Sequence, residues 1–206
     1  EEEREQYEAS RKNIELINMK CHDIRHQIRE GFGQNVDKEY IAGIEKLITI
    51  YDSTVKTGNN ELDVILTEKS LLCARNKITF SCIADGKTLA FMDKTDIYAL
   101  FGNLIDNAIE AVMKIEDEQS RIIDLSVKAT DKIVAVSVKN CFTGRVVTGK
   151  DGLPLTTKKD KGYHGYGLKS IKYIVEKYGG DFNVSVKNGI FGANIVLFLP
   201  PATEAR

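Results

Sequence analysis

The N-terminal part of the chain carries an apolar pattern that repeats every seven residues. Apolar or small residues occupy one register, and a second register falls three residues after its members: Tyr7, Ile14, Cys21 and Ile28, then Ser10, Ile17 and Ile24. This spacing is typical of a coiled-coil helix. On that helix His22 lies one position past the apolar seam, so we expect its side chain to project sideways into solvent.

A second helix is predicted after the break at GFGQNVD (31–37), where Asp37 can act as the N-cap. Its apolar positions recur at spacings of three and four: Ile41, Ile44, Ile48, Tyr51 and Val55. Two antiparallel helices with one apolar stripe each cannot close a core alone, so we expect two copies of the chain to pair as a four-helix bundle. The polar stretch TVKTGNNE (54–61) predicts a boundary between a helical hairpin at 1–57 and a second domain at 58–206.

The second domain mixes helix and strand patterns. A helix follows the boundary, with Asn60 as its candidate cap and a short set of apolar positions: Leu62, Ile65, Leu66 and Leu72. KITFSCIA (77–84) alternates as a strand does, and a turn at Asp85-Gly86 leads to KTLAFM. The later elements are a helix at 93–115, a strand pair at 122–130 and 132–141, a helix ended by Gly179, and two strands joined through Asn188-Gly189. Without strict βαβ alternation, the expected class is α+β, one mixed sheet covered on one face by helices.

The composition of the chain argues against several classes of partner and site. Among 206 residues, 29 Lys and Arg stand against 30 Asp and Glu, so no global field draws the chain to nucleic acid or an anionic membrane. Four scattered cysteines without a CxxC pair favour reduced cytosolic thiols over a zinc ribbon: Cys21, Cys73, Cys82 and Cys141. No apolar run approaches a bilayer span, and the start EEEREQYEASRKN is neither a signal nor a transit peptide, so we expect a region cut from something longer.

Polar side chains share one stripe of the helix predicted at 93–115, opposite its apolar face: Asn103, Asp106, Asn107 and Glu110. Carboxylate and amide oxygens of this kind suit a magnesium ion that keeps several waters and bridges nucleotide phosphates. An ordinary solvated helix face explains the same pattern.

Glycines crowd the start of the next helix in KGYHGYGLKSIKYI: Gly162, Gly165 and Gly167. Glycines let a backbone approach a ligand closely, and the free amides of a helix start attract phosphate. The alternative is that these glycines only mark a loop and bind no ligand, because the motif matches neither the dinucleotide fingerprint nor the Walker loop. The preceding segment DGLPLTTKKDKGYHG supplies Thr156, Thr157, Lys158 and Lys159 in a loop long enough to act as a lid.

The stretch CHDIRHQ (21–27) sets His22 and His26 four residues apart, with Asp23 after the first. That spacing places both imidazoles on one helix face, as in a zinc site, a buried pair or a nucleophile with a neighbour. The chain has one further histidine, His164, in the glycine-rich motif, which argues against zinc.

Four motifs in this order resemble the cytoplasmic kinase region of peptide-sensing and citrate-sensing bacterial histidine kinases: CHDIRHQI, NLIDNAIEA, GLPLTTKKD and HGYGLKSI. NLIDNAIEA looks like the N box, and HGYGLKSI like the second glycine box, of the GHKL ATPases. The resemblance covers essentially the whole chain. It implies a Bergerat-type α/β sandwich for 58–206 that holds ATP and Mg²⁺, preceded by a dimerisation and histidine phosphotransfer hairpin at 1–57.

The resemblance also implies roles for residues. Asn107 would be the principal magnesium ligand with Asn103 beside it, and His22 would accept the phosphoryl group with Asp23 as its neighbouring acid. Asn103 stands where gyrase-like members carry a glutamate that activates water, so hydrolysis is not the expected chemistry. The remaining nucleotide-binding positions by this resemblance are Glu110, Asn140, Thr157, Lys158, His164, Gly165, Tyr166, Gly167 and Leu168.

Two positions depart from the family pattern. The fourth residue after the acceptor is commonly Asn, Gln or Thr, and here it is His26, which bears on any phosphatase activity. The Asp-x-Gly that reads the adenine amino group is absent as such, and Asn140 takes its place by position.

The function implied is an ATP-dependent histidine kinase that autophosphorylates on His22 and passes the phosphoryl group to an aspartate of a response regulator. The implied partners are a second copy of the chain and the receiver domain, with a membrane reached only through a sensor region outside this chain. The implied location is the cytoplasmic side of a bacterial cell-membrane sensor. The alternative is a non-catalytic phosphotransfer or scaffold protein with a degenerate ATPase-like domain, motivated by the missing Asp-x-Gly.

Overall fold

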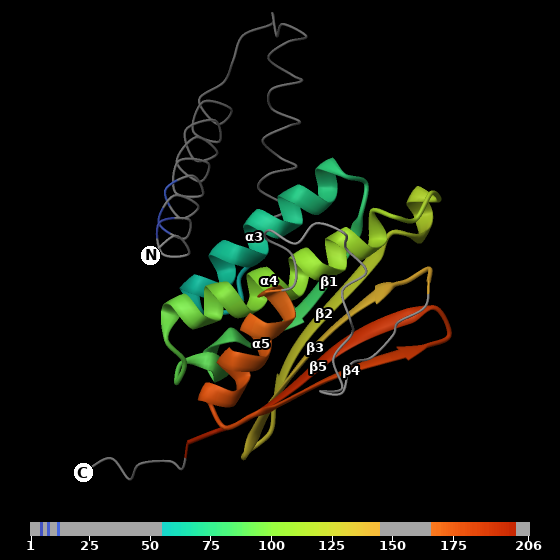
Figure 1. Cartoon of the computed structure of the whole chain (residues 1–206). Helices are drawn as coiled ribbons and strands as arrows, with labels where there is room; N and C mark the ends of the chain where they lie inside the picture. Colours follow the sequence, from blue (N-terminus) through green and yellow to red (C-terminus); the bar gives the residue numbers. More distant parts are fainter. Residues whose placement is uncertain (1–4, 6–7, 9–11, 13–54, 145–165, 201–206) are drawn as a thin grey trace, which may run out of the picture.

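A computed structural model describes Glu5, Glu8 and Lys12 together with residues 55–144 and 166–200 (Figure 1). The predicted helical hairpin at 1–57 therefore falls almost wholly outside the described residues. The boundary between the two domains, the four-helix bundle and the pairing of two copies remain predictions.

The described part of the second domain mixes helices and strands along the chain. Its elements are α3 (Asn60–Arg75), β1 (Thr79–Ala84), the 3-10 helix η1 (Gly86–Leu89), α4 (Lys94–Val112), the 3-10 helix η2 (Glu118–Ser120), β2 (Ile122–Ala129), β3 (Ile133–Cys141), α5 (Tyr166–Lys177), β4 (Asp181–Lys187) and β5 (Ile190–Phe198).

The strands form one mixed sheet, as predicted, in the order β1-β2-β3-β5-β4. β1 pairs with β2 in parallel, while the other three pairs are antiparallel. The β2–β3 hairpin places Leu125 opposite Val138, which in turn lies opposite Ala193 of β5. Side chains in such a row point to the same face of the sheet.

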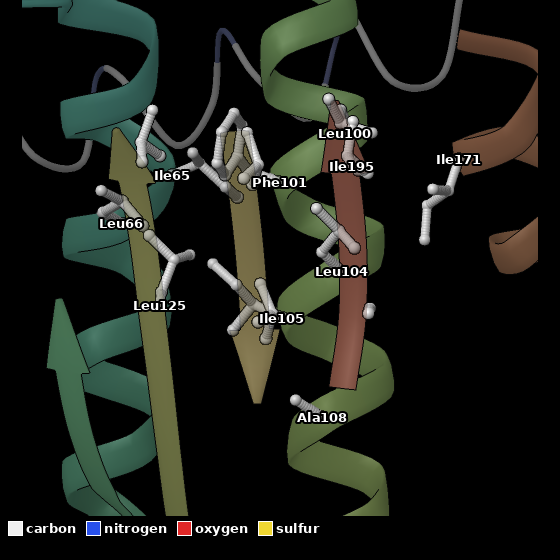
Figure 2. Close-up of a cluster of buried hydrophobic side chains, with 14 of the residues drawn as sticks. Ile65, Leu66, Leu100, Phe101, Leu104, Ile105, Ala108, Leu125, Ile171 and Ile195 are labelled. Carbon is white, nitrogen blue, oxygen red and sulfur yellow. The ribbon is translucent and has the colours of Figure 1, made fainter. Parts of the chain in front are cut away.

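One face of the sheet is buried beneath the three helices (Figure 1). Along β2, Ile123, Leu125 and Val127 are buried whereas Asp124 and Lys128 are exposed. Figure 2 shows side chains of α3 and α4 meeting those of the sheet in one core: Ile65, Leu66, Leu100, Phe101, Leu104, Ile105, Leu125 and Ile195. The predicted helix-covered sheet is confirmed, and its apolar burial is the main stabilising term of such a two-layer domain.

One local prediction was wrong. Asn59, not Asn60, caps α3, because its Oδ1 accepts a hydrogen bond from the Leu62 N–H at 3.0 Å. The segment KTLAFM, for which the sequence predicted no element, lies partly in η1, and the Gly86 N–H donates to the Thr57 carbonyl.

Two predicted chain reversals are confirmed. Gly179 follows α5 with a φ of +65°, a conformation that glycine adopts without a Cβ penalty. Asn188 and Gly189 both have positive φ between β4 and β5, as a two-residue hairpin turn requires.

Candidate functional site

The candidate site lies on α4, whose sequence divides into an apolar and a polar face. Its buried residues include Leu100, Leu104, Ala108 and Val112, at the three-to-four spacing that points one helix stripe into a core. Asn103 and Asn107 are half-buried at the margin of that stripe, one helical turn apart. The predicted polar face is therefore confirmed, and its two amides lie at its edge beside α5.

Asn103 is oriented by two hydrogen bonds. Its Nδ2 donates to the Ala99 carbonyl at 2.8 Å, and a longer contact of 3.4 Å reaches Ser170 Oγ on α5. With the amide nitrogen engaged by its own helix, Oδ1 faces the start of α5. A Cβ placed on Gly167 would lie only 3.3 Å from that oxygen.

Asn107 carries a buried amide nitrogen that lacks a hydrogen bond: no described residue accepts one from its Nδ2. A Cβ on Gly167 would lie 3.4 Å from both Nδ2 and Oδ1 of this side chain. A buried polar group without a partner costs folding free energy, so its persistence indicates that something else satisfies it.

The structure thus brings together three residues that the sequence motifs placed apart, namely Asn103, Asn107 and Gly167. Leu168 follows Gly167 on α5 and packs against the core, so its position supports the helix start by apolar contact. Tyr166 is the first residue of α5, but its side chain is not among those that the structure describes. Other predicted site residues also lie outside the described residues: His22, Asp23, His26, Thr157, Lys158, His164 and Gly165.

Asp106 is engaged by a residue that the sequence reasoning missed. Lys69 of α3 is only 7% exposed, and its Nζ lies 2.7 Å from Asp106 Oδ1 and 3.6 Å from Glu68 Oε1. A signal was present, because Lys69 falls three residues after Leu66 on the apolar stripe of its helix. A buried lysine in such a stripe requires an anionic partner.

Cys73 lies one turn beyond Lys69 and is a packing residue. Burial raises the pKa of its thiol to about 11, the charge of Lys69 acting in the opposite direction. A thiol that keeps its proton at neutral pH is a poor nucleophile. Cys73 is therefore no candidate nucleophile.

Glu110 continues the polar face of α4 one turn after Asn107. Its side chain is partly exposed, and Oε1 lies 3.5 Å from Lys114 Nζ in an i,i+4 pair. Exposed pairs of this type contribute little to stability. Glu110 stands on the predicted face, and its part in ligand binding remains a prediction.

Asn140 ends the inward-facing row of β3 and is only 3% exposed. Its Nδ2 donates to the Cys141 carbonyl at 2.8 Å, and Phe191 lies opposite it in the sheet register. Phe191 in turn packs against Phe142, with 6.1 Å between the ring centroids. The residue that stands in place of the family aspartate is therefore buried on the helix-covered face of the sheet.

The residues present fit a nucleotide with a magnesium ion. Within residues 55–144 and 166–200, no group of three or more His, Cys, Asp or Glu side chains gathers as a metal site. A metal at α4 would accordingly depend on amide oxygens, water and phosphate, a combination that Mg²⁺ accepts. Two observations support this fit: the Asn107 Nδ2 donor has no described partner and could donate to a phosphate or water oxygen, and Gly167 lies so near both amides that an added Cβ would be 3.3–3.4 Å from them.

Comparison with known proteins identifies the family of the chain. Residues 92–198 match the family model described as the GHKL domain. The "Probable C4-dicarboxylate sensor kinase" of Bacillus subtilis (strain 168) is 32% identical over 118 residues, which are 56% of this chain and 22% of that protein. Sensor histidine kinase DpiB of Escherichia coli (strain K12) is 33% identical over 94 residues, 43% of this chain and 17% of that protein. The chain thus spans about a fifth of the length of the curated relatives it matches.

Among solved structures, the nucleotide-free catalytic domain of the histidine kinase ThkA shares the fold. It superimposes with a TM-score of 0.54 at 21% identity, covering 70% of this chain and 93% of that domain. None of the helices in the described ranges is both long and apolar enough to cross a bilayer. Since the matched model covers more than half of the chain, the chain belongs to the GHKL family, and its resemblance to the sensor histidine kinases of that family is confirmed.

Proposed function

We propose that this chain is an ATP-dependent protein histidine kinase that phosphorylates itself on His22 and passes the phosphoryl group to an aspartate of a response regulator. The observation that carries the proposal is the buried Asn107 amide, which no described residue satisfies and which faces Gly167 beside Asn103. A polar ligand in that position would restore the missing hydrogen bond.

The nucleotide would bind between the polar face of α4 and the start of α5. Asn107 and Asn103 would offer amide oxygens to Mg²⁺, which when bound supplies charge neutralisation for the phosphates. On the opposite side Lys158 and the backbone amides at Gly165 and Gly167 would bind phosphate oxygens at the start of α5. Further contacts are assigned by resemblance to Glu110, Thr157, His164, Tyr166 and Leu168.

Asn140 would read the base. Its Nδ2 is committed to a backbone carbonyl, so the acceptor Oδ1 is the part of the amide that the exocyclic amino group of adenine would engage. An amide accepts this hydrogen bond as a carboxylate does, although without the gain that a charge supplies. The proposal therefore keeps adenine recognition at this position despite the missing aspartate.

The reaction follows from the chemistry of imidazole. A neutral ring has one nitrogen with a free lone pair, which would attack the γ-phosphorus of ATP in line with the leaving ADP oxygen. The new N–P bond forms as that P–O bond breaks, and the proton on the other ring nitrogen is stabilised by, or passes to, Asp23. Asn103 cannot act as a base toward water, which favours transfer to His22 over hydrolysis.

The proposed setting is a homodimer through the N-terminal helices, on the cytoplasmic side of a membrane sensor whose sensing part lies outside this chain. The receiver domain of a response regulator is the proposed partner for phosphotransfer. His26, in the position that commonly carries Asn, Gln or Thr, is the residue to vary when phosphatase activity toward that partner is measured.

The test is to incubate the purified chain with γ-labelled ATP and Mg²⁺ and to map the modified residue. His22→Ala should abolish acid-labile incorporation while ATP affinity stays unchanged, because the acceptor is not part of the nucleotide pocket. His26→Ala is the matched control on the same helix face, and it should still incorporate label. Label that persists on the His22 variant would remove His22 as the acceptor.

A non-catalytic scaffold is the second candidate, motivated by Asn140 in place of the family acid. Direct calorimetric titration with ATP and Mg²⁺ separates the two. A scaffold shows no binding, whereas a kinase binds in the micromolar range typical of enzyme substrates, roughly 1 μM to 1 mM.

A further inference from the structure

A cluster of polar residues joins α4 to α5 at the end of the helix pair opposite Gly167. Lys177 Nζ lies 2.8 Å from Asp93 Oδ2 and 2.6 Å from Asp96 Oδ2. The Tyr178 hydroxyl donates to Asp96 Oδ2 at 2.6 Å and accepts from the Asp93 N–H at 2.8 Å. We call these four residues, Asp93, Asp96, Lys177 and Tyr178, the α4–α5 clamp.

Aromatic contacts reinforce the clamp. The Tyr178 ring packs edge-on against Phe91, with 5.9 Å between centroids, and Lys177 Nζ lies 5.4 Å from the centre of the Tyr178 ring. Residues more than 80 positions apart in the sequence are thereby fastened at one point. The clamp bonds have fixed geometry, so they define where α5 stands along α4.

The ion pairs of the clamp should add little to the free energy of unfolding. The side chains of Asp93 and Lys177 are 72% and 43% exposed, and ion pairs between exposed groups contribute little to the free energy of unfolding. Asp96 is the more enclosed partner at 19% exposure. A role in setting position rather than overall stability is the explanation that fits this exposure.

α5 connects the clamp to the end of the helix pair where the nucleotide is proposed to bind, which we call the nucleotide end. The helix spans 12 residues, runs antiparallel to α4 on the same face of the sheet (Figure 1), and begins where Gly167 meets Asn103 and Asn107. Its buried side chains, Ile171 among them, make apolar contacts that lack direction. Apart from the 3.4 Å contact between Asn103 and Ser170, the clamp supplies the directional contacts described between α4 and α5, so a shift of α5 at the clamp also moves its N-terminal end.

The chain after the clamp is fixed to the sheet. Gly179 turns the backbone with its positive φ, and a Cβ on Gly180 would lie 2.5 Å from the Val196 carbonyl oxygen. The backbone of Gly180 therefore runs directly against β5. This contact makes the C-terminal end of α5 the anchored one and its N-terminal end the one whose position is set.

We propose that the α4–α5 clamp sets the distance between Gly167 and the amides of Asn103 and Asn107, which makes its members positioning residues for nucleotide binding. The inference rests on the proposed function and deepens it, since it names residues outside the pocket that act on nucleotide affinity through α5. They touch neither nucleotide nor metal, and their effect passes through the helix start.

The test replaces Lys177 in the full chain. Lys177→Met removes the charge and keeps the length, and we expect the dissociation constant for ATP with Mg²⁺ to rise by roughly 2- to 30-fold. Lys177→Arg should restore most of the affinity, because a guanidinium can still bridge two carboxylates. Lys172→Met is the matched control, since Lys172 lies on the same helix and pairs only loosely with Glu176 at 3.9 Å.

A double-mutant cycle separates positioning from simple destabilisation. If the clamp acts through α4's amides, combining Lys177→Met with Asn107→Ala should raise the dissociation constant by less than the product of the two single effects. Effects that multiply fully would show that the clamp acts elsewhere. Urea denaturation of each variant, with an unchanged midpoint expected for Lys172→Met, reports any loss of overall stability.

A second readout needs no nucleotide. The side-chain NH₂ resonances of Asn103 and Asn107 in ¹⁵N-labelled protein should shift in Lys177→Met and not in Lys172→Met. Failure of the wild type to bind ATP would refute the proposed function, whereas the NH₂ resonances would still test the clamp. Unshifted resonances would overturn the positioning role, and so would a wild type that binds ATP measurably but no more tightly than Lys177→Met.

Discussion

The two ends of the α4–α5 helix pair treat their polar groups in opposite ways. At the clamp end, Asp96 receives hydrogen bonds from both Lys177 and Tyr178 at 2.6 Å. At the nucleotide end, the only described contact between amide and α5 is the 3.4 Å approach of Asn103 Nδ2 to Ser170 Oγ, and Asn107 Nδ2 has no partner among the described residues. The clamp is thus a closed end, where the polar groups are paired with one another, and the other is an open end, where Asn107 Nδ2 has no described hydrogen-bond partner.

That difference distinguishes a structural polar cluster from a binding one. Buried polar groups are normally satisfied within the protein, and an unsatisfied one costs free energy unless a ligand meets it. Among the described residues Asn107 Nδ2 bears that cost, close to Gly167, whereas the polar groups of the clamp are paired with one another. Substitutions at the two ends should accordingly act differently: at the Asn107 end affinity is lost directly, whereas at the clamp it is lost through the position of α5, with a small change in the free energy of unfolding.

The largest effect is expected for Asn107→Ala at the nucleotide end. Loss of the amide removes a contact to a charged ligand, so magnesium-dependent ATP affinity should fall by about 10- to 150-fold. The free energy of unfolding should hardly change, because the deleted Nδ2 makes no hydrogen bond with described residues. Calorimetric titration and urea denaturation of the same preparation measure the two quantities.

Asn183→Ala is the control for that experiment, because Asn183 is an exposed amide on β4, where its Oδ1 makes only a 3.4 Å contact with Asn194. Neither affinity nor stability should change there. An Asn107 variant that binds ATP as the wild type does would remove the contrast between the two ends.

A smaller effect is expected for Gly167→Ala. The added methyl group would lie 3.3 Å from Asn103 Oδ1 and 3.4 Å from the Asn107 amide, so the Asn103 side chain must shift by a few tenths of an ångström. That displacement should weaken ATP binding by about 2- to 10-fold. Affinity measured beside Gly179→Ala, where a Cβ would meet nothing within 4 Å, separates crowding of the site from the general cost of replacing a glycine.

For Gly179→Ala the expected loss is in stability alone, since its φ of +65° disfavours any residue with a side chain. The opposite pattern, with affinity lost at Gly179 and kept at Gly167, would contradict the assignment of the site to the start of α5.

The sequence predicted what depends on local pattern. The period of three and four in α4 placed Asn103 and Asn107 on its polar edge, and the crowding of glycines located the start of α5. Alternating strands and turn residues predicted the mixed sheet and the Asn188-Gly189 reversal. These features follow from backbone preferences and helix or strand geometry, which act over a few residues.

Contacts between distant segments were not predictable in the same way. The Lys69–Asp106 ion pair and the α4–α5 clamp depend on how three helices settle on the sheet, which no local period encodes. The cap of α3 was misplaced by one residue, because adjacent asparagines have equal capping propensity and only the path of the backbone from Thr57 selects Asn59. The buried environment of Asn140 likewise depends on its register opposite Phe191.

The smallest effect is expected at the closed end, where the pH dependence of stability should reveal the clamp. Burial, together with the hydrogen bond to Asp96, raises the pKa of Tyr178 from its ordinary value of 10.0 to about 12. Below pH 10 the phenol is protonated in both folded and unfolded chains, so its contribution is fully present. Between pH 10 and 12 the unfolded chain ionises first, and that contribution is lost.

The measurement is the difference in the free energy of unfolding between the wild type and Tyr178→Phe, which keeps the ring contact with Phe91. That difference should be about 1 kcal/mol at pH 8 and should shrink at pH 11. Tyr173→Phe is the control at pH 8, because this tyrosine of the same helix is 70% exposed, and its loss should change stability by less than about 0.5 kcal/mol. A Tyr178 difference that stays constant up to pH 11 would mean that the phenol is not held by Asp96, and the contrast between a closed and an open end would then rest on Lys177 alone.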